Sequence, residues 1–102
     1  MLVVIPYNMD VRDNIAYSDI ARIASQENID FYNFFDRIDD IEIDVTQDYN
    51  DQTHLNYWGS VKFSAYLGQI ITEDGLVSDR RGQSEYKSWD DNATLLKLAE
   101  NE

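Results

Sequence analysis

The fold is decided by residues 1–35, which read MLVVIPYNMDVRDNIAYSDIARIASQENIDFYNFF. Residues 2–5 form a continuous apolar run closed by Pro6, and a run without polar alternation favours a parallel strand covered on both faces. Residues 12–27 carry apolar side chains at helical spacing, and residues 31–35 are aromatic and favour a second strand. A strand, a helix and a strand in this order predict a βαβ unit and hence an α/β fold.

Individual polar residues predict where the first helix begins and ends, and the composition of the segment after the second strand predicts a loop. Asp10 or Asp13 is a candidate N-cap, and Asn28 is a candidate left-handed terminator. Residues 36–51 are rich in Asp and predict a long loop with one short extended piece at residues 41–45. Long loops inside compact domains often carry function, which directs attention to this segment.

Two further helices are expected towards the C-terminus. Residues 57–72 have apolar side chains mostly at helical spacing, and Gly75 ends this helix or its extension. Residues 88–101 predict a last helix, opened by Ser88 and Asp91 as a capping-box-like pair in which Asp replaces the usual Glu or Gln.

Composition bounds the size and the partners of the protein. The chain has 102 residues, which fits one small domain, and 20 acidic against 8 basic residues give a net charge of −12. Such a charge repels phosphate backbones and anionic membranes, so no nucleic-acid partner is expected. The absence of cysteine excludes disulfides and cysteine-ligated zinc. The opening apolar run is too short for a signal peptide or a membrane span, and the sequence shows no cellular address.

The stretch that carries chemistry is residues 51–59, DQTHLNYWG. Asp51 and His54 are three residues apart, so on one helical turn the carboxylate would accept a hydrogen bond from His Nδ1 and leave Nε2 free to take a proton. His54 is the only histidine, and an unperturbed imidazole pKa of ~6.5 suits a general base. Spacing alone leaves an alternative open, in which Asp51 caps a helix and His54 lies on the surface.

This D-x-x-H-L-N block, followed by an aromatic residue, a glycine and an amphipathic helix, resembles the last sequence block of SGNH/GDSL hydrolases. The resemblance implies that Asp51 is the Asp and His54 the general base of a Ser-His-Asp triad, with Leu55, Asn56 and Gly59 as the usual surroundings. It also implies a three-layer α/β/α, flavodoxin-like fold with a parallel sheet, of which this chain is the C-terminal part.

The resemblance covers roughly residues 1–92. The first strand, the helix after it and the entry into the second strand at residues 29–31 are similar to the penultimate βα unit and last strand of that fold. Residues 79–89 look like a tail found in a bacterial branch of the family. We therefore expect residues 1–102 to form a single, partial SGNH-hydrolase-like domain.

The sequence also departs from the family, because the Gly-Asp-Ser-like nucleophile block and the two blocks that supply the oxyanion hole are missing. None of the serines follows a strand in a Gly-Asp context; they are Ser18, Ser25, Ser60, Ser64, Ser78, Ser84 and Ser88. A base without its nucleophile loses the covalent pathway, and each absent oxyanion donor removes a further ~2.7–4 kcal/mol of transition-state stabilisation. We expect the chain alone not to be an efficient esterase.

Two functions stay open. The first is a fragment of an SGNH esterase or of a carbohydrate O-acyl esterase or transferase, whose full-length parent would act on an acyl ester or an acylated carbohydrate and is often associated with the cell envelope. The second is a non-catalytic, oligomeric binding or structural module derived from that fold. In either case the strand at residues 2–5 would expose an apolar edge, and we expect a homodimer that covers it.

Other candidate sites are weaker, and no cofactor or metal is expected. The acidic segment at residues 36–51 lacks the EF-hand ligand spacing, and Asp51 with His54 lacks an obvious third metal ligand. Tyr57 and Trp58 would line an acyl or sugar pocket, although aromatic residues at a helix start more often belong to the core. Arg80 and Arg81 would clamp an anion, although solvated charges are the more common arrangement.

Overall fold

The computed structural model describes the backbone of residues 1–75 and 77–100, with side chains of the last helix as far as Lys97. It divides into two compact units, one of residues 1–70 and one that begins at Ile71. The elements in chain order are β1 (Leu2–Val4), α1 (Val11–Gln26), β2 (Phe31–Asn33), η1 (Phe34–Arg37), α2 (Ile38–Ile41), α3 (Tyr57–Glu73), η2 (Ser84–Tyr86) and α4 (Lys87–Glu100). Among the described residues, no helix is both long and apolar enough to cross a membrane.

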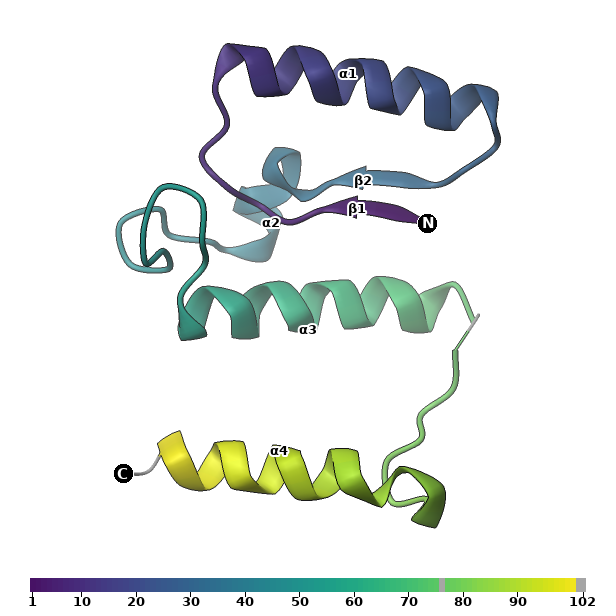
Figure 1. The fold of residues 1–102 in the computed structure, drawn as a ribbon, viewed down its shortest axis with the longest axis vertical. Coiled ribbons are helices and arrows are strands. Elements are labelled where there is room, and N and C mark those ends of the chain that lie inside the picture. Colours follow the sequence, from purple (N-terminus) through teal and green to yellow (C-terminus); the bar gives the residue numbers. More distant parts are fainter. Residues whose placement is uncertain (76, 101–102) are drawn as a thin grey trace. The chain divides into compact units, whose positions relative to one another are not determined.

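The first unit is built on the predicted strand–helix–strand pattern. β1 and β2 pair in parallel, with Leu2 opposite Phe31, Val3 opposite Tyr32 and Val4 opposite Asn33. In Figure 1 the helix α1 runs along one side of the two strands and α3 along the other. The prediction of a mixed α/β architecture with a short parallel sheet is therefore confirmed.

The ends of α1 form as the sequence predicts. Asp10 is the N-cap: its carboxylate accepts from Asp13 N at 2.9 Å, and the Asp13 carboxylate accepts in return from Asp10 N at 3.1 Å. This reciprocal pair satisfies two of the backbone donors that a helix leaves free at its start. Past the other end, Asn28 takes a left-handed conformation with φ of 55°. Both boundary predictions are confirmed.

The core of the first unit lies where β2 gives way to the following turns. Phe34, Ile41, Ile43 and Phe63 are buried together. The Phe34 ring stacks on Tyr32 with centroids 5.6 Å apart and meets Phe63 edge-on at 5.2 Å. Because these residues come from η1, from α2 and the segment just after it, and from α3, the cluster fixes α3 against the carboxyl end of the sheet.

Two expectations for the middle of the chain are wrong. The second strand stops at Asn33 instead of Phe35, because Asn33 Oδ1 accepts from Phe35 N at 3.2 Å and opens the 3₁₀ turn of η1. The extended piece expected at residues 41–45 is absent from the described chain, where α2 ends and Glu42 is left-handed with φ of 62°. Short polar side chains that bond to their own backbone compete with strand pairing at both places.

The expected helix at 57–72 is confirmed as α3, and its terminator is also as expected. The helix ends at Glu73, and Gly75 follows with φ of 67°, donating from its N–H to Thr72 O at 3.1 Å.

The second unit contains η2 and α4. The helix starts at Lys87, so Ser88 lies inside it and the capping box expected of Ser88 and Asp91 is wrong. Asp91 instead accepts from Lys87 Nζ at 2.6 Å. The reason is that the turn of η2 runs directly into α4, while Asp90 reaches back to accept from Gly82 N at 3.0 Å.

Candidate functional site

The candidate site is a tight turn at residues 51–54. Asp51 and His54 are in contact, with His54 Nδ1 at 2.9 and 3.0 Å from the two carboxylate oxygens of Asp51. The spacing predicted a helical turn, and this is wrong: the turn is closed by Asp51 Oδ1, which accepts from Thr53 N at 2.8 Å and His54 N at 2.9 Å. The same carboxylate therefore shapes the backbone and orients the imidazole.

The turn sits at the tip of a small hairpin. Tyr49 and Leu55 form an isolated antiparallel bridge, and Asn50 N donates to His54 O at 2.9 Å. Another backbone hydrogen bond, from Asn8 N to Gln52 O at 3.0 Å, joins the tip to the loop that follows β1. The pair is thus held at the carboxyl edge of a parallel sheet, the edge at which open α/β sheets bind ligands.

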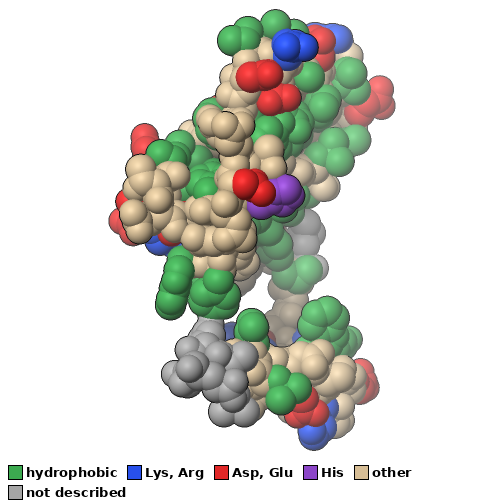
Figure 2. Space-filling view, turned by 60° about the vertical axis from the view of Figure 1, so that its left-hand side comes forward, with side chains coloured by type: hydrophobic (Ala, Val, Ile, Leu, Met, Phe, Trp, Pro, Cys, Tyr) green, Lys and Arg blue, Asp and Glu red, His purple; other side chains and the backbone are tan. Residues whose placement is uncertain are grey.

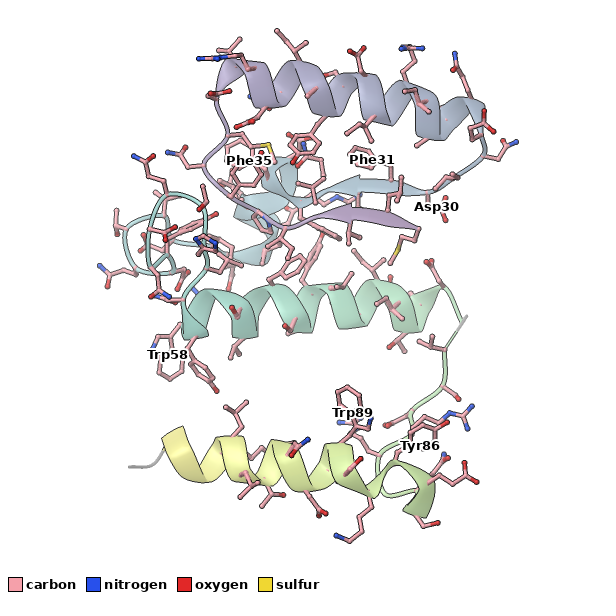
Figure 3. All side chains as sticks on the ribbon, in the orientation of Figure 1. Asp30, Phe31, Phe35, Trp58, Tyr86 and Trp89 are labelled. Atoms are coloured by element: carbon pink, nitrogen blue, oxygen red, sulfur yellow. The ribbon has the colours of Figure 1, made fainter. Side chains whose placement is uncertain are left out.

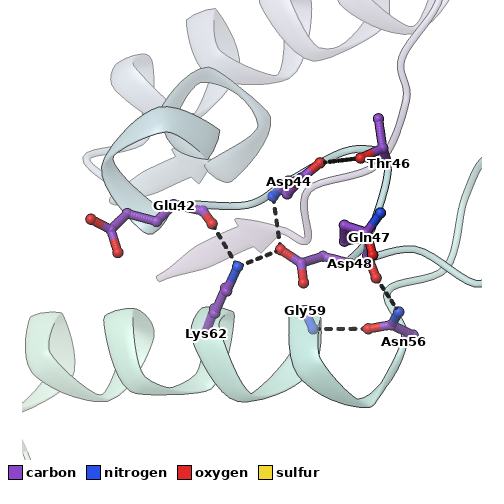
Figure 4. Close-up of polar contacts among 8 residues, drawn as sticks. All are labelled: Glu42, Asp44, Thr46, Gln47, Asp48, Asn56, Gly59 and Lys62. Atoms are coloured by element: carbon purple, nitrogen blue, oxygen red, sulfur yellow. Dashed lines mark hydrogen bonds and ion pairs between the residues drawn. The ribbon is translucent and has the colours of Figure 1, made fainter.

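A buried ion pair fixes the base of the hairpin to α3. Asp48 is only 3% exposed, and its Oδ2 accepts from Asp44 N and from Lys62 Nζ, both at 2.7 Å. Lys62 Nζ also donates to Glu42 O at 2.9 Å, so one ammonium group holds both ends of the segment (Figure 4). The hydrogen bond from Lys62 is the largest cause of a lowered pKa at Asp48.

Asn56 and Gly59 complete this attachment. Asn56 Oδ1 accepts from Gly59 N at 3.0 Å and its Nδ2 donates to Gln47 O at 2.6 Å, so the side chain ties the start of α3 to the hairpin (Figure 4). Asn56 N donates to Asp48 O at 2.9 Å. A β-carbon at position 59 would collide with that same Asp48 oxygen, which explains physically why a glycine stands there.

The sequence did not reveal Asp48 and Lys62 as members of this arrangement. They are fourteen residues apart, in a loop and a helix. Asp48 is one acidic residue among 20 in the sequence, so no spacing singled it out.

The electrostatics of the pair reflect its turn. The N–H of Thr53, followed by the hydrogen bond with His54, lowers the pKa of Asp51 from 3.8 to about 2. The Asp51 carboxylate therefore stays ionised at neutral pH. The side chains are 58% and 73% exposed for Asp51 and His54, and Figure 2 shows the imidazole and a carboxylate side by side on the surface. Water thus screens their interaction far more than in an enclosed site.

Thr53 adds a second possible partner for the imidazole. Its Oγ1 lies 2.9 Å from His54 Nδ1 and 3.2 Å from Asp51 Oδ1. If Nδ1 carries the proton, it donates to Asp51 and Nε2 is a free base. If Thr53 donates to Nδ1 instead, the proton resides on Nε2, which then has no lone pair for a substrate proton.

Two hollows border the tip, and each is lined by one member of the pair. The first has a volume of about 460 Å³ and includes Asp51 among its lining residues. The second, of about 750 Å³, follows β1 and includes His54, Ser60 and Ser64. Among the described contacts, neither serine is hydrogen-bonded to His54, so the structure assembles a base with its carboxylate but joins no nucleophile to them.

The next site that the sequence suggested is the aromatic pair at the start of α3. The interpretation of Tyr57 and Trp58 as core is wrong: Trp58 is 65% exposed and projects from the start of α3 away from the sheet (Figure 3). The two rings meet edge-on, with their centroids 5.0 Å apart.

In the second unit both arginines line one hollow, but Asp79 and Asp90 line it as well, and these carboxylates oppose the binding of an anion there. Arg81 is bound by Asp79, with its Nη2 2.6 Å from the carboxylate, and Arg80 stacks over the Tyr86 ring at 5.6 Å. In the part of the chain that the structure describes, no three carboxylate or imidazole side chains are placed to hold a metal ion.

Comparison with known proteins adds no relative. No family model, no curated protein and no solved structure matches this chain.

Proposed function

We propose that this chain is the C-terminal, acid–base part of an SGNH/GDSL-type serine hydrolase, acting on the ester of an acyl group with an alcohol or a carbohydrate. The observation that carries the proposal is the contact of His54 Nδ1 with both oxygens of Asp51, at 2.9 and 3.0 Å. The contact stands at the carboxyl edge of a parallel sheet, next to the loops that follow both strands. A carboxylate there keeps the imidazole oriented while Nε2 takes a proton from a hydroxyl.

The proposed roles are specific. Asp51 orients His54 and stabilises the imidazolium that forms, and His54 is the general base and then the general acid. The nucleophile and the oxyanion donors are to be supplied by sequence other than these 102 residues. By itself the chain is expected to be inactive, because an open, solvated base has neither a positioned hydroxyl nor a preorganised site for the developing charge.

The test begins with the coding region upstream of Met1. An in-frame Gly-Asp-Ser-like block there supports the proposal, and the extended protein should then hydrolyse a short acyl ester such as p-nitrophenyl acetate. His54→Ala and Asp51→Ala should each lower kcat/KM by about 10³-fold or more, since members of a triad act as a unit. Activity of the extended protein that survives His54→Ala would contradict the assignment of His54 as the general base.

The chain as it stands provides the second arm. Its rate on p-nitrophenyl acetate should not exceed that of free imidazole at the same concentration. Turnover at enzyme-like rates that is abolished by His54→Ala would contradict the reading of the chain as an incomplete site, while keeping His54 as the base.

A second candidate function, an oligomeric binding module, is favoured by the open edge of the sheet. In the described chain β1 pairs only with β2, and Leu2, Val3 and Ile5 are 46%, 41% and 54% exposed. Unpaired backbone groups beside apolar side chains form a ready template for another strand. We propose that two copies associate through this edge, each continuing the other's sheet.

Sedimentation velocity at micromolar concentration tests the association. The chain should sediment as a dimer, and Val3→Lys, which places a charge on the edge strand, should return it to a monomer. A chain that is monomeric without the substitution, at concentrations up to about 100 µM, would rule out a stable interface of this kind.

A further inference from the structure

The hollow on the Asp51 side of the tip has the form of a ligand site. Asn8 follows β1, Phe35 lies just past the end of β2, and Tyr49 to Gln52 belong to the hairpin, so three segments converge on it. Figure 3 shows Phe35 beside the loop that leads from β1 into α1. The volume of about 460 Å³ falls within the ~300–1,000 Å³ that is usual for small-molecule sites.

Three of the polar side chains that line it are amides, and the described part of the structure shows no hydrogen bond to any of the three. Asn8, Asn50 and Gln52 make only backbone hydrogen bonds among the described contacts, which leaves three side-chain amides free. Each amide offers two donors and an acceptor in one plane. This is the pattern needed by a molecule that presents adjacent hydroxyl groups, each both donor and acceptor.

The apolar groups that line it are mainly aromatic. Phe35 and Tyr49 are both half-buried, so each is held in place and shows part of its ring to the hollow. A fixed ring provides a flat apolar surface at little cost in side-chain entropy. Together the amides and the rings suit a ring-shaped polyol with one polar and one apolar face.

The charge around the hollow excludes anionic ligands. Asp51 is its only charged lining residue, and no lysine or arginine borders it in the described chain. The protein carries a net charge of −12 besides. A phosphate, a sulfate or a uronate would meet repulsion here with no cation to offset it, so an anionic ligand is excluded.

We propose that this hollow, defined by Asn8, Phe35, Tyr49, Asn50, Asp51 and Gln52, binds a neutral, unphosphorylated sugar. The role of this sugar rests on the proposed function. Because Asp51 also contacts His54, a sugar in the hollow lies beside the proposed base and would be the alcohol part of the ester. The binding itself does not require the imidazole, so it is measured separately from any hydrolysis.

The experiment is a titration of the whole ¹⁵N-labelled chain with cellobiose, xylobiose and N,N′-diacetylchitobiose, followed by two-dimensional NMR. At least one sugar should give saturable shifts centred on the side-chain amides of Asn8, Asn50 and Gln52, with a Kd on the order of 1 mM. Glucose 6-phosphate, the anionic probe, should give none. Absence of saturable shifts with all three sugars overturns the inference, as does equal binding of the phosphate.

Variants locate the site without relying on residues that hold the fold. Asn50→Ala and Gln52→Ala remove side chains that make no internal hydrogen bond, and each should weaken binding by about 10-fold. Trp58→Ala, which removes an exposed ring outside the hollow, is the matched control and should leave Kd unchanged. Binding that is lost in Trp58→Ala and kept in Gln52→Ala would place the sugar elsewhere and overturn the inference.

His54→Ala separates the two proposals. Sugar binding should be unchanged in this variant. If the sugar binds while hydrolysis by the extended protein does not depend on His54, the proposed function fails alone. If hydrolysis depends on His54 while none of the sugars binds, the sugar site fails alone.

Discussion

At the Asp51–His54 pair, the position of one proton decides what the imidazole can do. The carboxylate of Asp51 favours the proton on Nδ1, whereas the Thr53 hydroxyl at 2.9 Å from Nδ1 favours it on Nε2. A charged acceptor forms roughly twice as strong a hydrogen bond as a neutral hydroxyl, so we expect the Nδ1–H tautomer to prevail. ¹⁵N chemical shifts of the imidazole at a pH where it is neutral will distinguish the two forms.

Three substitutions test whether Asp51 and Thr53 control the tautomer of His54. Thr53→Val removes the competing hydroxyl and should increase the Nδ1–H population, whereas Asp51→Ala should shift the proton towards Nε2. Asp79→Ala removes a carboxylate that also closes a turn but lies far along the chain, and it should change nothing at the imidazole. A tautomer ratio that is the same in Asp51→Ala as in the parent chain would show that the carboxylate does not orient the ring.

The carboxylate of Asp51 itself should titrate at an unusually low pH. Its pKa is lowered from 3.8 to about 2, first by the N–H of Thr53 and next by His54. Because the folded value lies below the unfolded one, the contribution of this carboxylate to stability is fully present above pH 3.8 and is lost as the pH falls through about 2. Carbon-detected NMR titration should give a midpoint near 2, and His54→Ala should raise it only in part, since the backbone donor stays in place.

At the scale of elements, two glycines of α3 should respond in opposite directions to the same substitution. A β-carbon at position 59 would overlap Asp48 O and lie 3.0 Å from Leu55 Cδ2, whereas at position 68 it would meet no atom within 4 Å. Gly59→Ala should therefore destabilise the fold by about 1–3 kcal/mol through overpacking. Gly68→Ala should stabilise it by about 0.5–1 kcal/mol, the usual gain of alanine over glycine in a helix.

Urea unfolding of both variants measures the difference. If the two substitutions shifted the free energy of unfolding in the same direction, then the hairpin would not be packed against the start of α3 as described. The heteronuclear NMR spectrum of Gly59→Ala should also show its largest changes at residues 48 and 51–56, because the displaced oxygen belongs to the base of the hairpin.

The ion pair between the hairpin and α3 should matter far more than the exposed pair in α4. Lys62→Met leaves the buried Asp48 carboxylate without its ammonium partner and should cost about 1–3 kcal/mol at neutral pH. Lys87→Met breaks the solvent-exposed contact with Asp91, and no measurable change is expected.

The pH dependence of this difference has a definite sign. Lys62 holds the pKa of Asp48 below its ordinary value of 3.8, so the stabilisation by the pair is present above that pH and is lost as the pH falls through the lower, folded value. Thermal unfolding curves should therefore show the Tm gap between Lys62→Met and the parent chain narrowing on acidification. A gap that widens instead would mean that Asp48 is not ionised in the fold.

The sequence predicted the regular elements well because their signals are local. Helical periodicity and the candidate N-caps Asp10 and Asp13 located α1, and the apolar run located β1. The errors arose where a single side chain redirects the backbone: Asn33 ends β2 by bonding to Phe35 N, and Asp44 Oδ1 accepts from Thr46 N at 2.8 Å where a strand was expected. Propensity averaged over a window does not register such a contact.

The site was predicted in part, for the same reason. Asp51 and His54 are close in sequence, so their spacing allowed a contact, and the resemblance of the block singled it out, although the turn between them is not helical. The support from Lys62 and the convergence of Asn8 with the hairpin depend on residues that meet only in three dimensions. The amide-lined hollow follows from that convergence, and no motif marks it.

At the scale of the whole molecule, the charge of −12 opposes association of two copies. The proposed interface along β1 is apolar, with Leu2, Val3 and Ile5 exposed. Its contribution to binding should therefore depend little on salt at low and moderate ionic strength. The long-range repulsion between two acidic chains, in contrast, weakens as salt is added, because the Debye length falls from about 30 Å at 0.01 M salt to about 8 Å at 0.15 M.

Dimerisation should accordingly strengthen as salt is added. Sedimentation equilibrium in NaCl from about 0.01 M to about 0.3 M should show a falling dissociation constant, with most of the change below 0.15 M, where screening changes most. Val3→Lys makes each chain one unit less negative and so reduces the repulsion, yet it should weaken the dimer at every salt concentration, because the lysine disrupts the apolar edge. A dissociation constant that rises with salt would instead identify an interface built on ion pairs, which the apolar edge of β1 does not offer.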